Sequence, residues 1–474
     1  MTLALGIDIG TSGIRTAVLD ESGTLVSSMR EDHVPQDIDR IDADLWWQAV
    51  KSCLKSQVNA LKGTDHHPSC ITRIAVDGTS GSMVLTDAQL QLISRALMYN
   101  SKGFDLEAKL IAKYAPKHHI TQGANSALAR AMRLASETEI KADHLLHQAD
   151  FIAAKLTCQA GLSDHNNSLK TGYDPEAGCW PDWIEAVIDP KIMPKVFAVG
   201  TPIKNLDQGV AKEIGLTANT LVCAGTTDSI AAFLAAAPLE MGISVTSLGS
   251  TLAVKMLSPY RIDDHEIGLY SHKIGDAWLV GGASNTGGAV LLEHFTPEQM
   301  IQLSAQIDPS IPTGLDYYPL VKPEERFPIN DPDLEPRIAP RPGNDAIFLQ
   351  ALLEGIAKIE AKCYREVEAR TGVYPKMIFT AGGGARNNVW SQIRAQALRC
   401  APLRAKYSEA AIGAAKVSRM GAVMCGWPRL CKVFFRLMLI VTESGHVSGL
   451  LMRLMLPLAL MKSAYRVPNQ TNEL

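Results

Sequence analysis

The chain has 474 residues, of which 46% are hydrophobic and 20% are charged, and its formal net charge at pH 7 is −3. This length suits two or three domains with sizeable cores, and the composition excludes a chain dominated by disorder. The near-neutral charge gives no electrostatic reason to expect nucleic acid or an anionic membrane as a partner.

The cysteines point to a reducing compartment. Nine occur, which is an odd number, and none stands in a C-x-x-C pair. Residues 1–9 lack the basic segment of a signal peptide and include Asp8. We therefore expect reduced thiols and a cytoplasmic location.

The first predicted elements form an antiparallel meander of strands. Residues 3–9 and 13–20 are short apolar runs, and residues 24–32 are a third candidate strand. Asp8 lies near the end of the first run, and Gly10-Thr11-Ser12-Gly13 forms the turn after it.

A helix and a further strand are predicted next. Residues 42–62 carry apolar side chains at helical spacing, with Asp42 or Asp44 as the N-cap. Residues 71–78 read as a strand that ends in an acid and a second Gly-Thr-Ser-Gly turn, at residues 78–81.

The second half repeats this order. Residues 220–237 predict strand, turn and helix, and residues 242–257 predict strand, Gly-Ser-Thr turn and strand. A long helix is predicted over residues 346–371, and residues 376–398 predict strand, triple-glycine turn and helix. We expect two mixed α/β domains of related design, with a boundary near residue 240.

Three turns that combine glycine with hydroxyl residues carry the first chemical signal. They lie at residues 10–13, 78–81 and 249–251, each after a strand-like run. Successive backbone N–H groups in such turns bind anions, and hydroxyls donate to phosphate oxygens. None matches the P-loop pattern. Each alone is also an ordinary hairpin turn.

Two acids and a glycine-rich turn extend this signal. Asp8 suits Mg²⁺ opposite nucleotide phosphates, or alternatively an Asx-turn. Asp228, after Gly-Thr-Thr, suits a general base for a substrate hydroxyl, or alternatively a helix N-cap. Residues 381–388, AGGGARNN, join a strand to a helix and suit a nucleotide lying against the backbone.

Taken in order, these motifs resemble the FGGY family of carbohydrate kinases over residues 3–420. The segments that carry the resemblance are GIDIGTSGIRTAVLDESG, SDHNNSLKTGYDPEAGCW, the stretch containing GTTDS, TSLGSTLAVK, TAGGGARNNVWSQIRAQAL and SEAAIGAAKVS. The resemblance implies an α/β fold with two actin-like, ribonuclease H-like ATPase domains flanking a catalytic cleft. Residues 1–241 would form the sugar and phosphate side, and residues 242–420 the nucleotide side.

The resemblance also implies roles for single residues. Asp228 would be the general base, with Asp8 and Thr11 as further catalytic residues and Asp8 and Asp228 at the Mg²⁺. The residues implied to bind ATP are Gly10, Thr11, Ser12, Gly249, Ser250, Thr251, Gly287, Gly288, Gly382, Gly383, Gly384 and Asn387. The sugar-side candidates are Ser12, Ser80, Tyr99, Asn100 and Asp228.

The implied reaction is ATP-dependent phosphorylation of a sugar hydroxyl. The turns at residues 10–13 and 78–81 are most similar to the cyanobacterial and plant pentulose kinase branch, so D-ribulose is the first candidate and D-xylulose or another polyol the second. In a plant-type relative a plastid location is an alternative, although no transit peptide is seen. A partner-moving actin-like ATPase and an inactive ATP- or sugar-binding protein are the alternative functions.

Two segments fall outside these motifs. Residues 322–345 are rich in proline and charge and predict a long surface loop. Residues 421–474 are rich in leucine and methionine, and we interpret them as a non-native end or a changed reading frame. A packing helix or a membrane-surface segment is the alternative, and charged residues interrupt every window long enough to span a bilayer. The oligomeric state is left open.

Overall fold

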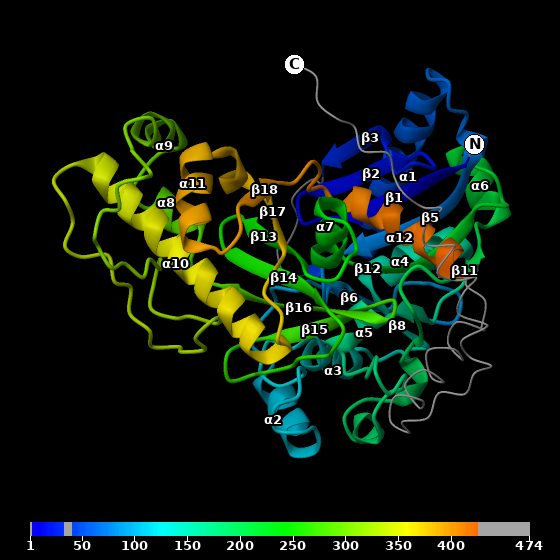
Figure 1. Ribbon diagram of the computed structural model, residues 1–474. Coiled ribbons are helices and arrows are strands. Elements are labelled where there is room, and N and C mark those ends of the chain that lie inside the picture. The colour runs from blue at the N-terminus through cyan, green and yellow to red at the C-terminus, as the bar shows by residue number, and fades with distance from the viewer. Residues whose placement is uncertain (1, 33–39, 425–474) are drawn as a thin grey trace, which may run out of the picture. The chain divides into compact units, whose positions relative to one another are not determined.

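The opening hairpin lies in the middle of the first large sheet. The computed structural model describes residues 2–32 and 40–424. The first sheet has six strands in the order β11-β12-β5-β1-β2-β3 (Figure 1). They are β1 (Leu3–Ile9), β2 (Gly13–Leu19), β3 (Leu25–Asp32), β5 (Ile71–Gly78), β11 (Pro202–Asn205) and β12 (Leu221–Thr227). β1, β2 and β3 pair antiparallel, which confirms the predicted meander, and β5 and β12 run parallel to β1.

The second large sheet repeats this pairing. Its order is β15-β16-β14-β13-β17-β18. The strands are β13 (Ile243–Leu248), β14 (Leu252–Ser258), β15 (Tyr270–Ile274), β16 (Ala277–Ser284), β17 (Met377–Ala381) and β18 (Pro402–Arg404). The β13–β14 hairpin pairs with parallel β17 just as β1–β2 pairs with β5. The expected repeat of one α/β design is confirmed.

Helices cover both sheets. The α-helices are α1 (Ala43–Lys62), α2 (Asp105–Tyr114), α3 (Ala127–Glu137), α4 (Gln148–Thr157), α5 (His165–Leu169), α6 (Gln208–Ile214), α7 (Asp228–Ala236), α8 (Gly288–Leu292), α9 (Pro297–Ser304), α10 (Asp345–Thr371), α11 (Asn388–Ala397) and α12 (Ala410–Met424). Short 3-10 helices are η1 (Pro68–Cys70), η2 (Asp182–Ala186), η3 (Pro190–Ile192) and η4 (Gly383–Arg386). The predicted cap of α1 is Asp42, which accepts a hydrogen bond from Asp44 N. The predicted long helix is α10, which runs along the second sheet (Figure 1).

Two small sheets build the part of the fold around residues 80–200. The larger has the order β4-β7-β6-β8, from β4 (Arg40–Ile41), β6 (Met83–Thr86), β7 (Ala96–Leu97) and β8 (His144–His147). The smaller pairs β9 (Leu162–Asp164) with β10 (Lys195–Phe197). Met83, Phe104, Leu128 and Leu145 share one apolar core here, which fixes the loops that follow β5 and β7.

The last described helix packs on the first sheet. Ala411 and Ile412 of α12 share a core with Ala17 and Leu19 of β2. Gly413 lies so close to α7 that a Cβ there would overlap the carbonyl oxygen of Ala231. α12 therefore follows the second sheet in the chain but covers the first one.

Residues 322–345 differ from the expected surface loop. Phe327 is 0% exposed and Glu325 is 1% exposed. Glu325 accepts hydrogen bonds from Ser284 Oγ at 2.6 Å and from Asn285 N at 2.7 Å, which ties the segment to the end of β16. The prediction of a surface loop was wrong at these positions because composition does not reveal single buried anchors.

The unusual C-terminal segment predicted from residue 421 lies outside the described residues, apart from the last turn of α12. Within the described part of the chain, no helix combines the length and the apolar character needed to span a membrane.

Candidate active site

Asp8 lies next to the end of β1, with Arg15 directly opposite on β2. Its carboxyl is buried, with only 6% of the side chain exposed, and accepts a hydrogen bond from Arg15 Nη1 at 3.2 Å. Burial raises the pKa of Asp8, while a hydrogen bond with Asp77 and the charge of Arg15 oppose the rise. Asp8 is thus a desolvated acid paired with the guanidinium group of Arg15.

The turn after Asp8 presents two hydroxyl side chains. Gly10 N donates to the Gly13 carbonyl oxygen at 3.0 Å and closes the turn. Thr11 and Ser12, between them, are exposed. The predicted phosphate-binding turn therefore leaves its hydroxyls accessible to a ligand.

Asp77 is a third carboxyl group that the sequence analysis gave no role. It is the penultimate residue of β5, in register with Asp8 on one side and with Thr226 of β12 on the other, and it is 0% exposed. Burial raises the pKa of Asp77 well above its ordinary value, and the charges of Asp8 and Asp228 add to the rise. The raised pKa favours the neutral form of Asp77 beside Asp8. Its signal in the sequence was an acid at the same place before a Gly-Thr-Ser-Gly turn.

Asp228 is the first residue of α7, directly after β12. The N-cap of this helix is Thr227, so the capping alternative for Asp228 does not hold. Asp228 Oδ1 accepts a hydrogen bond from Ser229 N at 2.6 Å. Burial raises the pKa of Asp228, the charge of Asp8 adds to the rise, and Lys255 and Lys170 oppose it. Asp228, the predicted base, and Asp8, the acid predicted beside Mg²⁺ and the phosphates, are therefore close enough for their charges to interact.

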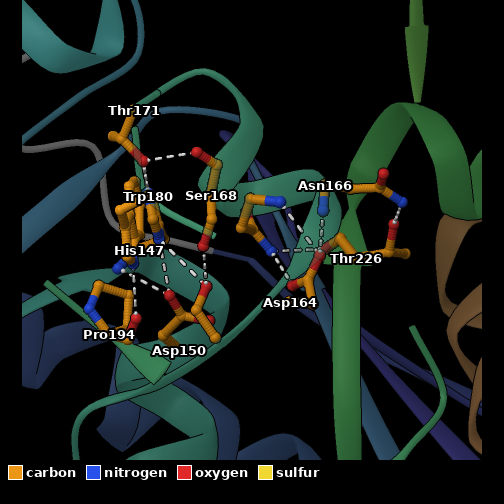
Figure 2. A network of polar contacts seen from close by, with 11 residues as sticks. His147, Asp150, Asp164, Asn166, Ser168, Thr171, Trp180, Pro194 and Thr226 are labelled. Atoms are coloured by element: carbon orange, nitrogen blue, oxygen red, sulfur yellow. Dashed lines mark hydrogen bonds and ion pairs between the residues drawn. The ribbon is translucent and has the colours of Figure 1, made fainter. Parts of the chain in front are cut away.

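A buried polar network fixes the strand that leads to Asp228 (Figure 2). Asp164 accepts hydrogen bonds from the backbone N–H groups of Asn166 and Asn167 and from Asn167 Nδ2, at 2.8, 3.0 and 2.6 Å. Asn166 Nδ2 donates to Thr226 Oγ1 at 3.0 Å, and Asn167 Nδ2 donates to the Thr226 carbonyl oxygen at 3.1 Å. The motif SDHNN thus holds β12 two residues before Asp228.

The same network continues to His147 (Figure 2). His147 Nδ1 lies 2.7 Å from Asp150 Oδ2, and Ser168 Oγ donates to Ser163 Oγ at 3.0 Å. All of these groups are buried. Burial and the charge of Asp150 raise the pKa of Asp164 to about 6. The hydrogen bonds of this buried network hold α5 and the end of β12 in a fixed arrangement.

The hydroxyl-bearing turn at residues 249–251 is hydrogen-bonded to the start of α8. Gly288 N donates to the Gly249 carbonyl oxygen at 2.8 Å, and Ala289 N donates to that of Ser250 at 3.0 Å. Gly287 has φ 144°, and a Cβ there would lie 2.7 Å from Ser250 O, so only glycine fits. The structure therefore brings the predicted pair Gly287–Gly288 against the turn Gly249–Thr251.

The triple-glycine turn at residues 382–384 also lies beside the turn at residues 249–251. A Cβ on Gly382 would lie 3.2 Å from Gly249 N, and Gly383 and Gly384 begin η4. Asn387 is the N-cap of α11: its Oδ1 accepts from Trp390 N at 3.0 Å, and its Nδ2 donates to Ser304 Oγ at 2.9 Å. The glycines predicted at the nucleotide thus gather at one end of the second sheet, whereas the amide of Asn387 serves the helix and α9.

A cavity of about 440 Å³ is lined in part by Lys170, whose charge also acts on Asp228. Its lining includes Ser80, Tyr99, Gln122, Arg130, Lys170 and Tyr270. Two of the predicted sugar-side residues, Ser80 and Tyr99, line it. Asn100 does not, because the chain turns from Met98 to Ser101 and leaves Asn100 exposed, and Ser12 stays at the tip of the first hairpin.

Six polar or aromatic lining residues were not predicted: Gln122, Asn125, Ser126, Arg130, Lys170 and Tyr270. Arg130 donates to the Tyr99 carbonyl oxygen at 2.7 Å and to that of Gly81 at 2.8 Å. Lys170 Nζ lies 5.7 Å from the centre of the Tyr270 ring. These residues come from separate segments, and only Lys170 belongs to a motif that the sequence analysis singled out.

The acids at the hairpin fit a hard divalent cation. Asp8 and Asp228 supply carboxylate oxygens, the donor type that Mg²⁺ prefers. Within residues 2–32 and 40–424, no three His, Cys, Asp or Glu side chains are grouped as a metal site of their own. Mg²⁺ is usually held by one or two carboxylates together with water and substrate phosphates.

Comparison with known sequences identifies two family models along the chain. The N-terminal domain model of the FGGY family of carbohydrate kinases matches residues 3–235, and the C-terminal domain model matches residues 245–422. The xylulose kinase of Staphylococcus xylosus is 23% identical over 455 residues, covering 89% of this chain and 91% of its own length. That of Escherichia coli (strain K12) is 23% identical over 415 residues, covering 82% and 84%.

Solved structures share the fold. A xyloylose kinase from Brucella ovis has a TM-score of 0.79 at 20% identity, covering 89% of this chain and 90% of that one. Plasmodium falciparum glycerol kinase with ADP has a TM-score of 0.76 at 16% identity, covering 91% and 92%. These likenesses confirm the two-domain α/β fold.

Proposed function

We propose that this protein, which belongs to the FGGY family of carbohydrate kinases, transfers the γ-phosphoryl group of ATP to a hydroxyl of a ketopentose. Membership makes it an ATP-dependent sugar kinase, and leaves the partner-moving ATPase without support. The observation that carries the proposal is the meeting of Asp8, Asp77 and Asp228 at one edge of the first sheet, contacted from the second sheet through Lys255 and Ser229.

D-Ribulose is our first candidate substrate and D-xylulose the second. The turns at residues 10–13 and 78–81 are similar to those of the cyanobacterial and plant pentulose kinase branch, which favours D-ribulose. The relatives named above are xylulose kinases, which favours D-xylulose. Because the two sugars are epimers of equal size, the cavity beside Ser80 has to select between them by hydrogen bonds.

In the proposed mechanism Asp228 accepts the proton of the attacking sugar hydroxyl. Thr11 contacts the transferring phosphoryl group, and the turn at residues 249–251 holds the β- and γ-phosphates through backbone N–H and hydroxyl donors. Residues 382–384 lie beside the adenosine. Mg²⁺, held by Asp8 with Asp228 nearby, supplies neutralisation of phosphate charge when it is bound.

We further propose that the parts of the chain before and after residue 241 bind different ligands. Residues 1–241 bind sugar and phosphate, and residues 242–420 bind the nucleotide. The support is that most of the cavity around Ser80 and Tyr99 precedes this boundary, while the glycine turns around Gly249 and Gly383 follow it. The partners are then a small sugar and ATP, in the cytoplasm, rather than nucleic acid or a membrane.

A coupled assay of ADP release tests the proposed function. The acceptors are D-ribulose, D-xylulose, L-ribulose and glycerol, with a reaction lacking sugar as the blank. We expect sugar-dependent release with a D-ketopentose, at a kcat/KM at least about tenfold above that for glycerol. ADP release that is equal with and without sugar, or that responds to glycerol alone, would contradict the proposal.

A further inference from the structure

Lys255 connects the second sheet to the beginning of α7. It lies on β14, soon after the turn at residues 249–251, and pairs with Val245 on one side and Gly281 on the other. Its Nζ donates a hydrogen bond to Ser229 Oγ at 2.8 Å. Ser229 belongs to α7, on the first sheet, so this contact joins segments on either side of the proposed boundary.

Ser229 is in turn bound to Asp228. The backbone N–H of Ser229 donates to Asp228 Oδ1 at 2.6 Å, while its hydroxyl accepts from Lys255. The charges of Lys255 and Asp228 also act on each other, since each opposes the effect of burial on the other. Lys255, Ser229 and Asp228 therefore form one continuous chain of polar contacts.

The side chain of Lys255 is partly exposed, and it points to the face of β14 opposite to the buried Val254 and Met256. Burial lowers the pKa of Lys255 to about 7, and the charge of Asp228 opposes this effect. The ammonium group is therefore partly desolvated where Ser229 Oγ accepts its hydrogen bond.

We propose that Lys255 is a positioning residue of the phosphoryl transfer: through Ser229 it holds the Asp228 carboxylate in a fixed place relative to the phosphate-binding turn of β13 and β14. This inference rests on the proposed function, in which Asp228 is the base. Since in-line transfer depends on the placement of the attacking hydroxyl, loss of this contact affects the chemical step more than substrate binding.

Steady-state kinetics of Lys255→Met, Lys255→Arg, Ser229→Ala and the double variant Lys255→Met/Ser229→Ala test the proposal. We expect Lys255→Met to lower kcat by about 10–100-fold with both KM values within about threefold of the wild type. Lys255→Arg keeps the donor and is expected to recover most of kcat. Ser229→Ala should lower kcat to a similar degree, and the double variant should be no slower than the slower single one, because the two residues act as a unit.

The matched control is Lys358→Met, on the exposed face of α10, which should leave kcat unchanged. A wild-type kcat in Lys255→Met, or losses that multiply in the double variant, would overturn the positioning role. If Lys255→Met fails to fold, as shown by circular dichroism, Ser229→Ala decides alone: a wild-type kcat overturns the proposal. An active Asp228→Asn variant would instead overturn the proposed function itself.

Discussion

Asp8, Asp77 and Asp228 share one desolvated region with only a few cations. Each has a raised pKa, and burial is the largest cause in all three. The cations differ, since Arg15 faces Asp8 while Lys255 and Lys170 act on Asp228. Burial and neighbouring acids raise the pKa of Asp77 well above its ordinary value, whereas Lys255 and Lys170 oppose the rise at Asp228, which suits the proposed role of Asp228 as the base.

Replacing Asp228 by Asn should lower kcat/KM by about 10²–10⁴-fold, because a general base of that efficiency is lost. In the wild type only the ionised carboxylate is active, so kcat/KM should fall as pH falls through a pKa that lies above 3.8. A pH series of initial rates with saturating ATP measures this. An acid limb that is identical in the Asn variant would assign the titration to another group.

The Asp77→Asn variant should be less sensitive to alkaline pH than the wild type. A raised folded-state pKa means that Asp77 contributes stability at low pH, and that this contribution is lost as pH rises through the raised value. Asn cannot ionise, so the melting temperature of the variant should fall less than that of the wild type between about pH 5 and about pH 9. Differential scanning fluorimetry across this range compares the two curves, and parallel curves would refute the expectation.

Among the elements, β12 depends on α5 for its exact position. Asp164 caps α5 and, through Asn166 and Asn167, holds Thr226 at the end of the strand. Asp228, the proposed base, is thus placed by side chains that are more than fifty residues earlier in the chain. A helix this short needs such tertiary hydrogen bonds to be stable.

Asp164→Ala should therefore destabilise the protein. Two backbone N–H groups and one amide lose their acceptor in a buried place, which costs about 2–4 kcal/mol of the free energy of unfolding. Asp164→Asn retains Oδ1 as an acceptor for the two N–H groups and should lose less. Urea unfolding followed by circular dichroism measures both, and equal losses in the two variants would show that charge rather than capping matters.

Regular patterns in the sequence were sufficient to predict the two longest helices, α1 and α10. The helix expected over residues 42–62 and the long helix near residues 346–371 are confirmed as α1 and α10 because apolar spacing and capping are local signals. Gln122, Arg130 and Tyr270 could not be predicted, since only folding brings them to one cavity. Lys255 was missed because its partner, Ser229, lies on α7 and is brought to β14 only by folding.

For the whole molecule, α12 is the element that ties the end of the described chain to its beginning. It starts after β18 of the second sheet and packs on β2 and α7 of the first. Lys416 Nζ adds a hydrogen bond to the Leu234 carbonyl oxygen of α7 at 2.6 Å. Small residues at Ala411, Gly413 and Ala415 let the helix backbone come this close.

Gly413→Ala should weaken this attachment. Alanine gains up to about 1 kcal/mol in helix propensity, but its Cβ would overlap Ala231 O, and such overpacking costs about 1–3 kcal/mol or more. We expect a lower free energy of unfolding in urea. Gly343→Ala is the control, because a Cβ there meets nothing within 4 Å. A Gly413→Ala variant as stable as the control would contradict the close packing.

The path of the chain has a mechanical consequence. It passes from α7 to β13 and later returns from β18 to α12, so two covalent links join the parts built on the two sheets. These two links oppose sliding and twisting of the two parts against each other. Rotation about the line that joins the links is then the motion that they restrict least. A ligand that contacts both parts then needs to restrict only this rotation, so the conformational entropy that the protein loses on binding is small.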